Sequence, residues 1–113
     1  MKIRIKDHVK LAADKMAKIA LHATDRTLLD LYCVAPGQSQ KAHSHEAQDK
    51  IYYVLEGAGR FSLSGAEQRL EAGEALVAPA GVEHGLVNDG AGPLLVLVVV
   101  APPPPHGPGG AKA

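Results

Sequence analysis

The informative part of this chain begins with GQSQKAHSHEAQDKIYYVLEG at residues 37–57 and continues with GEALVAPAGVEHGLVN at residues 73–88. The first segment contains two histidines, His43 and His45, separated by one residue. In a β-strand such residues point to the same face with their Cα atoms roughly 7 Å apart, so both imidazoles can reach one metal ion. A histidine pair of this kind also arises by chance, so it is a weak signal by itself.

The rest of the chain alternates short β-prone runs with turns that contain Gly, Pro, Asn or Asp. This alternation of runs and turns predicts strands at residues 28–34, 50–56, 60–64, 67–70, 75–78, 84–87 and 94–100. Turn signals spaced by roughly 8 to 12 residues favour an antiparallel sandwich or barrel over βαβ units. Residues 8–21 are the exception, because they can also be interpreted as a weak helix.

The chain has 113 residues, of which 46% are hydrophobic, enough for one core and one domain. We place the barrel domain at residues 27–101, after an N-terminal segment at 1–26 that forms a weak helix or an edge strand. The Pro/Gly-rich tail at 102–113, which includes His106, is expected to be disordered. Residues 94–100 lack polar alternation, so both faces should be covered, one by the core and the other by a second subunit. We therefore expect a homodimer.

The charge of the chain and its lack of targeting signals bear on its partners and its location. The formal net charge is zero, which argues against nucleic-acid binding. Residues 1–26 carry seven Lys or Arg against three Asp, and without interleaved aromatic residues they predict only a solvated basic segment. The single cysteine, Cys33, and the lack of a leader-like start predict a cytoplasmic protein. The longest apolar run, at residues 94–101, is too short to cross a membrane as a helix.

The two segments together resemble the two conserved motifs of the cupin family. The second segment has the order G(x)5PxG(x)2H(x)3N, carried by Gly73, Pro79, Gly81, His84 and Asn88. The first has G(x)5HxH, carried by Gly37, His43 and His45, and closes at Gly57. The resemblance implies an all-β fold, the cupin double-stranded β-helix, which is an antiparallel jelly-roll barrel. It also implies that His43, His45 and His84 bind a divalent transition metal, without distinguishing Fe, Mn, Ni or Zn, and that a small-molecule ligand binds inside the barrel.

The chain departs from the family pattern at the fourth protein ligand, which is normally a glutamate. Counting forward from His45 gives Asp49, whereas counting back from Gly57 gives Lys50. One residue of difference reverses the face of a strand, so either Asp49 reaches the metal through a bulge or there is no acidic ligand. Gln48 is a further oxygen donor.

An inward-facing Lys50 could pair with an anionic substrate or act as a base, whereas at a strand edge it would be solvated. Of the two adjacent tyrosines, Tyr52 is the pocket candidate, because Tyr53 must face the opposite side. The family hosts several reactions, so the sequence supports two main hypotheses: a metal-dependent enzyme such as a dioxygenase or isomerase, and a non-catalytic ligand-binding or sensor protein. A scaffold with relic histidines is the third.

Overall fold

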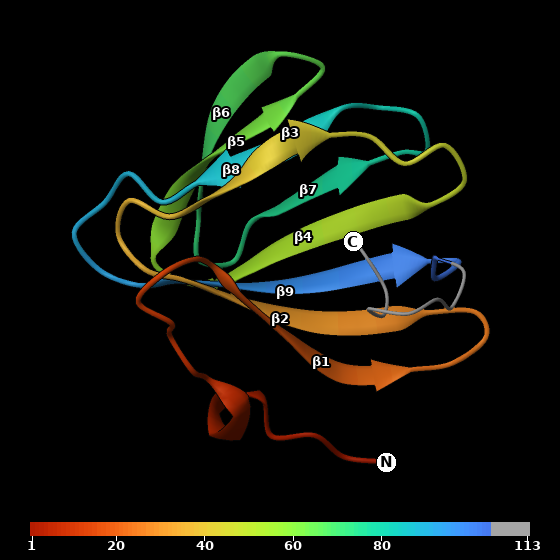
Figure 1. The fold of residues 1–113 in the computed structure, drawn as a ribbon, viewed down its shortest axis with the longest axis horizontal. Helices are drawn as coiled ribbons and strands as arrows, with labels where there is room; N and C mark the ends of the chain where they lie inside the picture. Colours follow the sequence, from red (N-terminus) through yellow and green to blue (C-terminus); the bar gives the residue numbers. More distant parts are fainter. Residues whose placement is uncertain (105–113) are drawn as a thin grey trace.

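A computed structural model of the protein describes residues 1–104. These residues form two antiparallel β-sheets that face each other (Figure 1). The larger sheet has, in spatial order, β1 (Ala17–Ala23), β2 (Leu28–Val34), β9 (Leu94–Ala101), β4 (Asp49–Glu56) and β7 (Ala75–Ala78). The smaller sheet has β3 (Ser39–His43), β8 (His84–Val87), β5 (Ala58–Leu63) and β6 (Ala66–Glu71). The expected all-β, antiparallel jelly-roll class is confirmed.

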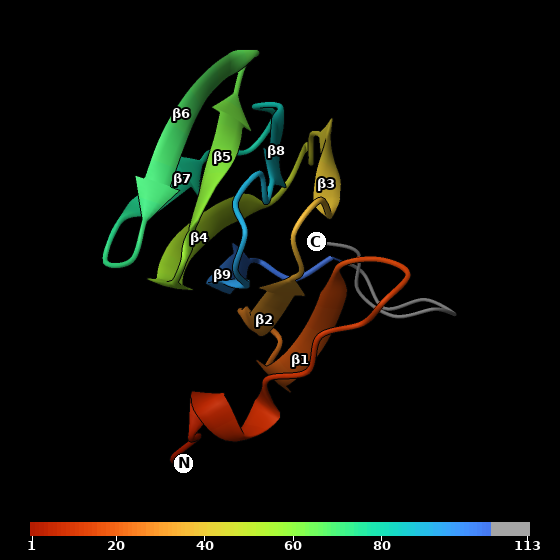
Figure 2. The same ribbon diagram turned by 90° about the vertical axis from the view of Figure 1, so that its left-hand side faces the viewer.

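The core lies between the two sheets, and Figure 2 shows them inclined to each other around it. Strand β9 is central in the larger sheet and shows most clearly how buried side chains alternate with less buried ones. Its even-numbered residues, Leu94, Val96, Val98 and Val100, are fully or almost fully buried in this core. Alternate side chains of a strand face opposite sides of a sheet, so the odd-numbered residues of β9 lie on the outer face.

The N-terminal segment covers part of that outer face. Ile5 from the 3-10 turn η1 (Ile5–His8) and Ile19 from β1 pack against a second cluster made by Leu31, Cys33 and Leu95. The interpretation of residues 8–21 as a helix is therefore wrong: the second half of that stretch is the edge strand β1. Pairing with β2 over the whole length of β1 outweighs a weak local helix propensity.

The outer face of the larger sheet is not covered completely. Ile51 and Tyr53 on β4 and Val77 on β7 are 37%, 40% and 53% exposed. Leu97 and Val99 of β9 are half buried on the same face. The predicted homodimer would use such a surface, and it stays a prediction.

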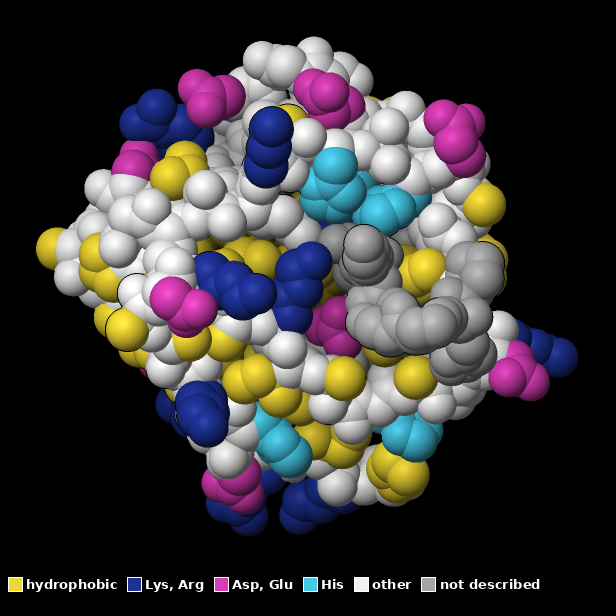
Figure 3. Space-filling model, in the orientation of Figure 1, with side chains coloured by type: hydrophobic (Ala, Val, Ile, Leu, Met, Phe, Trp, Pro, Cys, Tyr) yellow, Lys and Arg dark blue, Asp and Glu magenta, His cyan; other side chains and the backbone are white. Residues whose placement is uncertain are grey.

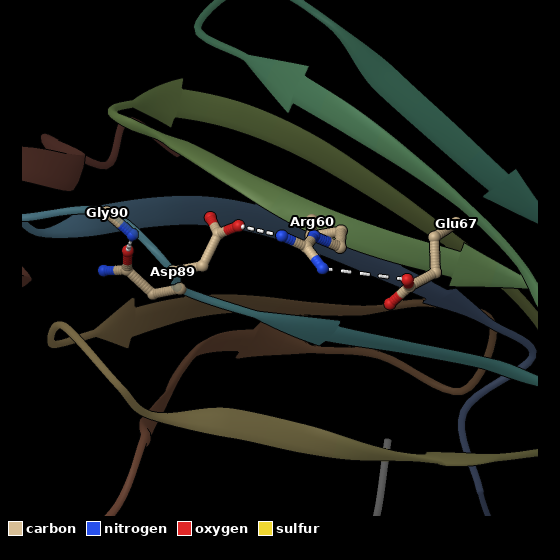
Figure 4. Close-up of polar contacts among 5 residues, drawn as sticks. Arg60, Glu67, Asp89 and Gly90 are labelled. Atoms are coloured by element: carbon tan, nitrogen blue, oxygen red, sulfur yellow. Dashed lines mark hydrogen bonds and ion pairs between the residues drawn. The ribbon is translucent and has the colours of Figure 1, made fainter.

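The smaller sheet is tied to the loop after β8 by polar contacts. On its outer surface Arg60 donates a hydrogen bond to Asp89 at 2.7 Å and forms an ion pair with Glu67 at 3.8 Å (Figure 4). Asn88, the last residue of the second motif, is fully buried and donates hydrogen bonds from its amide nitrogen to the carbonyls of Val34 and Gly92. Its role is structural, because it links the two sheets. Within residues 1–104 no helix is long and apolar enough to span a membrane.

Candidate metal centre

Three histidines come together at one end of the smaller sheet. His43 is the last residue of β3 and His84 the first of β8, and the two are partners in the strand pairing. His45 lies beyond β3, in the loop that leads to β4. The ring centroids are 4.4 Å apart for His43 and His84, 4.8 Å for His43 and His45, and 5.7 Å for His45 and His84. One ring nitrogen from each lies within 4.8 Å of the others, so the cluster could hold a metal ion.

His43 and His45 lie close together, but not because they are alternate residues of one strand, as their spacing suggested. The two do not share a regular strand, since β3 ends at His43 and its register with β8 shifts between Gln40 and His43. The loop after β3 is held instead by the backbone N–H of Gly81, which donates to the carbonyl of His45 at 2.7 Å. This contact ties the His45 loop to the turn that precedes His84.

Glycine at position 85 allows β8 to approach β3. A Cβ atom at this residue would lie 2.9 Å from backbone atoms of Ala42 and from the carbonyl oxygen of Gln40. No side chain fits at that distance, so only glycine permits the approach that brings His84 beside His43. Gly73 and Gly81 both have positive φ, +91° and +81°, a backbone conformation that glycine adopts readily in turns.

Backbone contacts fix the orientation of two of the imidazoles. Nδ1 of His84 lies 2.9 Å from the carbonyl oxygen of Val82, and Nδ1 of His43 lies 2.8 Å from that of Lys41. A carbonyl can only accept, so Nδ1 carries the proton and Nε2 keeps the lone pair that a metal requires. The Nε2 atoms of His45 and His84 are buried and make no hydrogen bond within residues 1–104. Buried polar atoms usually have a partner, and a metal ion would supply one.

The environment also favours the neutral form of His45 and His84. Burial lowers the pKa of His84 to about 4; the Val82 carbonyl opposes the shift, and the positive charge of Lys50 adds to it. Burial likewise lowers the pKa of His45, with further contributions from His43, Lys50 and Lys18. A neutral imidazole is the form that binds a metal, so both nitrogens are available at neutral pH.

The predicted fourth ligand, Asp49, does not join the cluster. Pairing between β4 and β9 runs without a bulge from Asp49 to Val54, and along it the exposed side chains alternate with buried ones, beginning with an exposed Asp49. The Asp49 carboxylate accepts a hydrogen bond from the backbone N–H of Ala80 at 2.9 Å. The idea that Asp49 reaches the metal through a bulge is therefore wrong, and its contact instead secures the turn before His84. Gln48 lies in the preceding loop and is half buried.

Lys50 is the inward-facing residue of the pair. It is fully buried on the core side of β4, so the alternative of a solvated lysine at a strand edge is wrong. Its ammonium group donates to Oε1 of Gln40 at 3.3 Å and lies over the rings of Tyr32 and Tyr52, 5.0 and 4.9 Å from their centroids. Burial lowers its pKa to about 7; the charge of Lys18 acts in the same direction and that of Asp30 opposes it.

Gln40 is a polar residue beside the site that the sequence analysis did not identify. Its side-chain oxygen also accepts from the hydroxyl of Tyr52 at 2.7 Å, and its amide nitrogen donates to the hydroxyl of Tyr32 at 3.5 Å. Tyr52 is buried, and its ring centroid is 6.0 Å from that of His84. The predicted pocket candidates Lys50 and Tyr52 thus share one polar partner. Recognising β3 as a strand would have placed Gln40 in the same sheet as His43.

Asp30 is a second residue missed at the sequence level. Its side chain, on β2, is almost fully buried. Burial raises the pKa of its carboxyl, and the charges of Lys18 and Lys50 counteract that shift. Figure 3 shows histidine side chains reaching the surface on the face that also carries basic and acidic side chains. The site therefore combines neutral imidazoles with one buried cation and one buried acid.

Comparisons with known proteins agree with this architecture. The family model of the cupin domain matches residues 30–100. A solved structure, that of TT1209 from Thermus thermophilus, is 46% identical and superposes with a TM-score of 0.88 over 92% of this chain and 100% of that one.

Two curated relatives also match. The oxalate-binding protein of Thermotoga maritima is 32% identical over 69% of this chain and 64% of its own length. The tetracenomycin polyketide synthase protein TcmJ of Streptomyces glaucescens is 39% identical over 57% of this chain and 43% of its own length. The chain thus spans less than two thirds of the length of either relative.

Proposed function

Because this chain belongs to the cupin family, we propose that His43, His45 and His84 bind one divalent transition metal ion and that the protein uses it to bind and convert a small molecule. The observation that carries the proposal is the convergence of buried, neutral imidazole nitrogens without hydrogen-bond partners at His45 and His84. Such a donor set suits Fe, Mn, Ni or Zn.

The chain's own residues would prepare the site in three ways. The Lys41 and Val82 carbonyls hold the His43 and His84 rings with Nε2 unprotonated. The buried tyrosines and valines of the core limit access of water. Three protein ligands leave coordination positions for a substrate oxygen, and a bound ion would supply Lewis-acid chemistry there. An oxygenase- or isomerase-type reaction fits this arrangement.

A second candidate is a non-catalytic cupin that binds a small ligand. The observation that favours it is Lys50, which takes the inward position where the family motif has an acid. A cation there weakens metal binding, and a weakly held ion suits a binding protein better than an enzyme. The printed name of the Thermotoga relative, an oxalate-binding protein, supports a small-molecule ligand for either candidate. In both candidates we propose a cytoplasmic homodimer that binds neither nucleic acid nor membrane.

The test of the metal site compares histidine variants. Purified protein is loaded separately with Zn, Mn, Fe(II) or Ni, desalted, and analysed for metal by inductively coupled plasma mass spectrometry. We expect close to one ion per chain for at least one metal, and its loss in His45→Ala and His84→Ala. His22→Ala is the matched control, because His22 is exposed on β1. Equal metal content in all variants would exclude this site.

A further inference from the structure

We propose that the small molecule bound at this site is a carboxylate anion and that the ammonium group of Lys50 holds it beside the metal. This inference rests on the function proposed above and specifies its ligand. It starts from the position of Lys50, which is the only buried basic residue apart from histidine within residues 1–104.

The ammonium group of Lys50 has hydrogen-bonding capacity that the protein does not use. A lysine ammonium has three N–H donors, and within residues 1–104 one hydrogen bond is found, to Gln40. None of the ion pairs in this part of the chain involves Lys50. A buried cation without a carboxylate within ion-pair distance is costly, so a bound anion that supplies one would be stabilised.

Lys50 is also held in place by its neighbours in the core. Gln40 accepts from both Lys50 and Tyr52 through the same oxygen, and the faces of the Tyr32 and Tyr52 rings flank the ammonium group. Tyr52 in turn lies next to the His84 ring. Lys50 and the histidine cluster are thus joined through one aromatic residue, and the charge of Lys50 acts on both His45 and His84.

The balance of charge in the interior favours an anion over a neutral ligand. Asp30 is the only buried acid within residues 1–104, and it offsets the charge of Lys50. The pKa values of His45 and His84 are lowered and none of the three metal-binding residues is an acid, so a divalent ion would add two positive charges that no protein ligand neutralises. In a barrel of the usual family pattern the glutamate ligand removes one of them. Here the incoming ligand has to do so, which selects a molecule with one or two negative charges.

The lowered pKa of Lys50, about 7, agrees with this interpretation. The shift arises mainly from burial, which the charge of Asp30 opposes without cancelling it, and an anion next to the amine would favour its protonated form. The carboxylate and the ammonium group thus stabilise each other's charge.

The experiment uses the zinc-loaded full chain and two probes of similar shape, oxalate and its uncharged diamide, oxamide. Binding is measured by isothermal titration calorimetry for the wild type, Lys50→Met and Lys10→Met, and zinc content is determined after each titration. Lys10 is exposed, so its replacement removes one lysine charge far from the core. We expect oxalate to bind at least about tenfold more tightly than oxamide, and Lys50→Met to lose about tenfold or more in oxalate affinity.

Other outcomes separate the two proposals. Equal affinity for oxalate and oxamide, or unchanged oxalate affinity in Lys50→Met, would overturn this inference while normal zinc content leaves the metal site intact. If the wild type retains none of Zn, Mn, Fe(II) and Ni, both the proposed function and this inference are overturned. Lys50→Met is also expected to bind zinc more tightly while it binds oxalate less tightly, a combination that partial unfolding cannot produce.

Discussion

Replacing Lys50 by methionine should stabilise the metal-free protein at neutral pH. Methionine has a similar length and no charge, so it fills the same space without the cost of burying an ammonium group. An unperturbed lysine has a pKa of 10.5, whereas burial lowers the pKa of Lys50 to about 7 in the folded protein. That gap of about 3.5, at about 1.4 kcal/mol for each pH unit, sets an upper limit of about 5 kcal/mol on the cost of the buried charge.

The direction in which wild-type stability changes with pH follows from proton binding. Between about pH 7 and pH 10.5 the unfolded chain holds a proton on Lys50 that the folded chain has released, so wild-type stability rises with pH across this range. The methionine variant has no such proton and lacks this contribution. Loss of the contacts with Gln40 and the two tyrosine rings reduces the benefit, leaving about 2–4 kcal/mol at pH 7. For 113 residues this corresponds to a rise in Tm of about 8–17 °C.

The assay is urea-induced unfolding followed by circular dichroism in the presence of EDTA. The stability difference between Lys50→Met and wild type should shrink by about 3 kcal/mol between about pH 7 and pH 9.5. Taking the difference cancels the contributions of other titrating groups, and Lys10→Met serves as the control for loss of an exposed lysine. A methionine variant that is less stable than wild type, with a difference independent of pH, would refute the account of Lys50 as a buried cation.

Three further substitutions test other parts of the structure. Lys50→Glu should raise metal affinity, measured by competition with a chelator, whereas Asp49→Glu should not, because only position 50 faces the core; equal effects would contradict this assignment. Asn88→Ala should cost about 2–4 kcal/mol in urea unfolding, since it removes a fully buried amide with three hydrogen bonds. Arg60→Ala should cost less than about 1 kcal/mol despite two ion pairs, because these are partly exposed; a larger loss would show that this surface network matters more than its exposure suggests.

The fold was predictable because its strands are marked by alternation and by turns. Residues 28–34, 75–78 and 84–87 were predicted with the bounds that the structure has. The edge strand β1 was only one of two alternatives for the N-terminal segment, because its alanine-rich sequence also favours a helix and only the hairpin with β2 makes it a strand. Strand β3 was not predicted as such because Ser39–His43 is short, polar and mostly exposed, without the hydrophobic alternation that identifies a strand.

The site was predictable for the histidines and only partly for their neighbours. The spacing of the two motifs predicted that His84 lies near His43 and His45, although His84 is distant from them in sequence and no local pattern indicates the contact. The choice between Asp49 and Lys50 depended on the register of β4, a one-residue difference that only the pairing with β9 resolves. Asp30 and Gln40 belong to strands that reach the barrel interior from other parts of the chain, so their proximity to Lys50 is a property of the tertiary fold.

The most direct test of the metal centre is a crystal structure of the zinc-loaded protein with anomalous diffraction data collected at the zinc absorption edge. The account predicts one anomalous peak about 2.0–2.1 Å from Nε2 of each of His43, His45 and His84, with Asp49 still bound to the turn before His84. A zinc ion located elsewhere, or coordinated by Asp49 in place of one of these histidines, would contradict it.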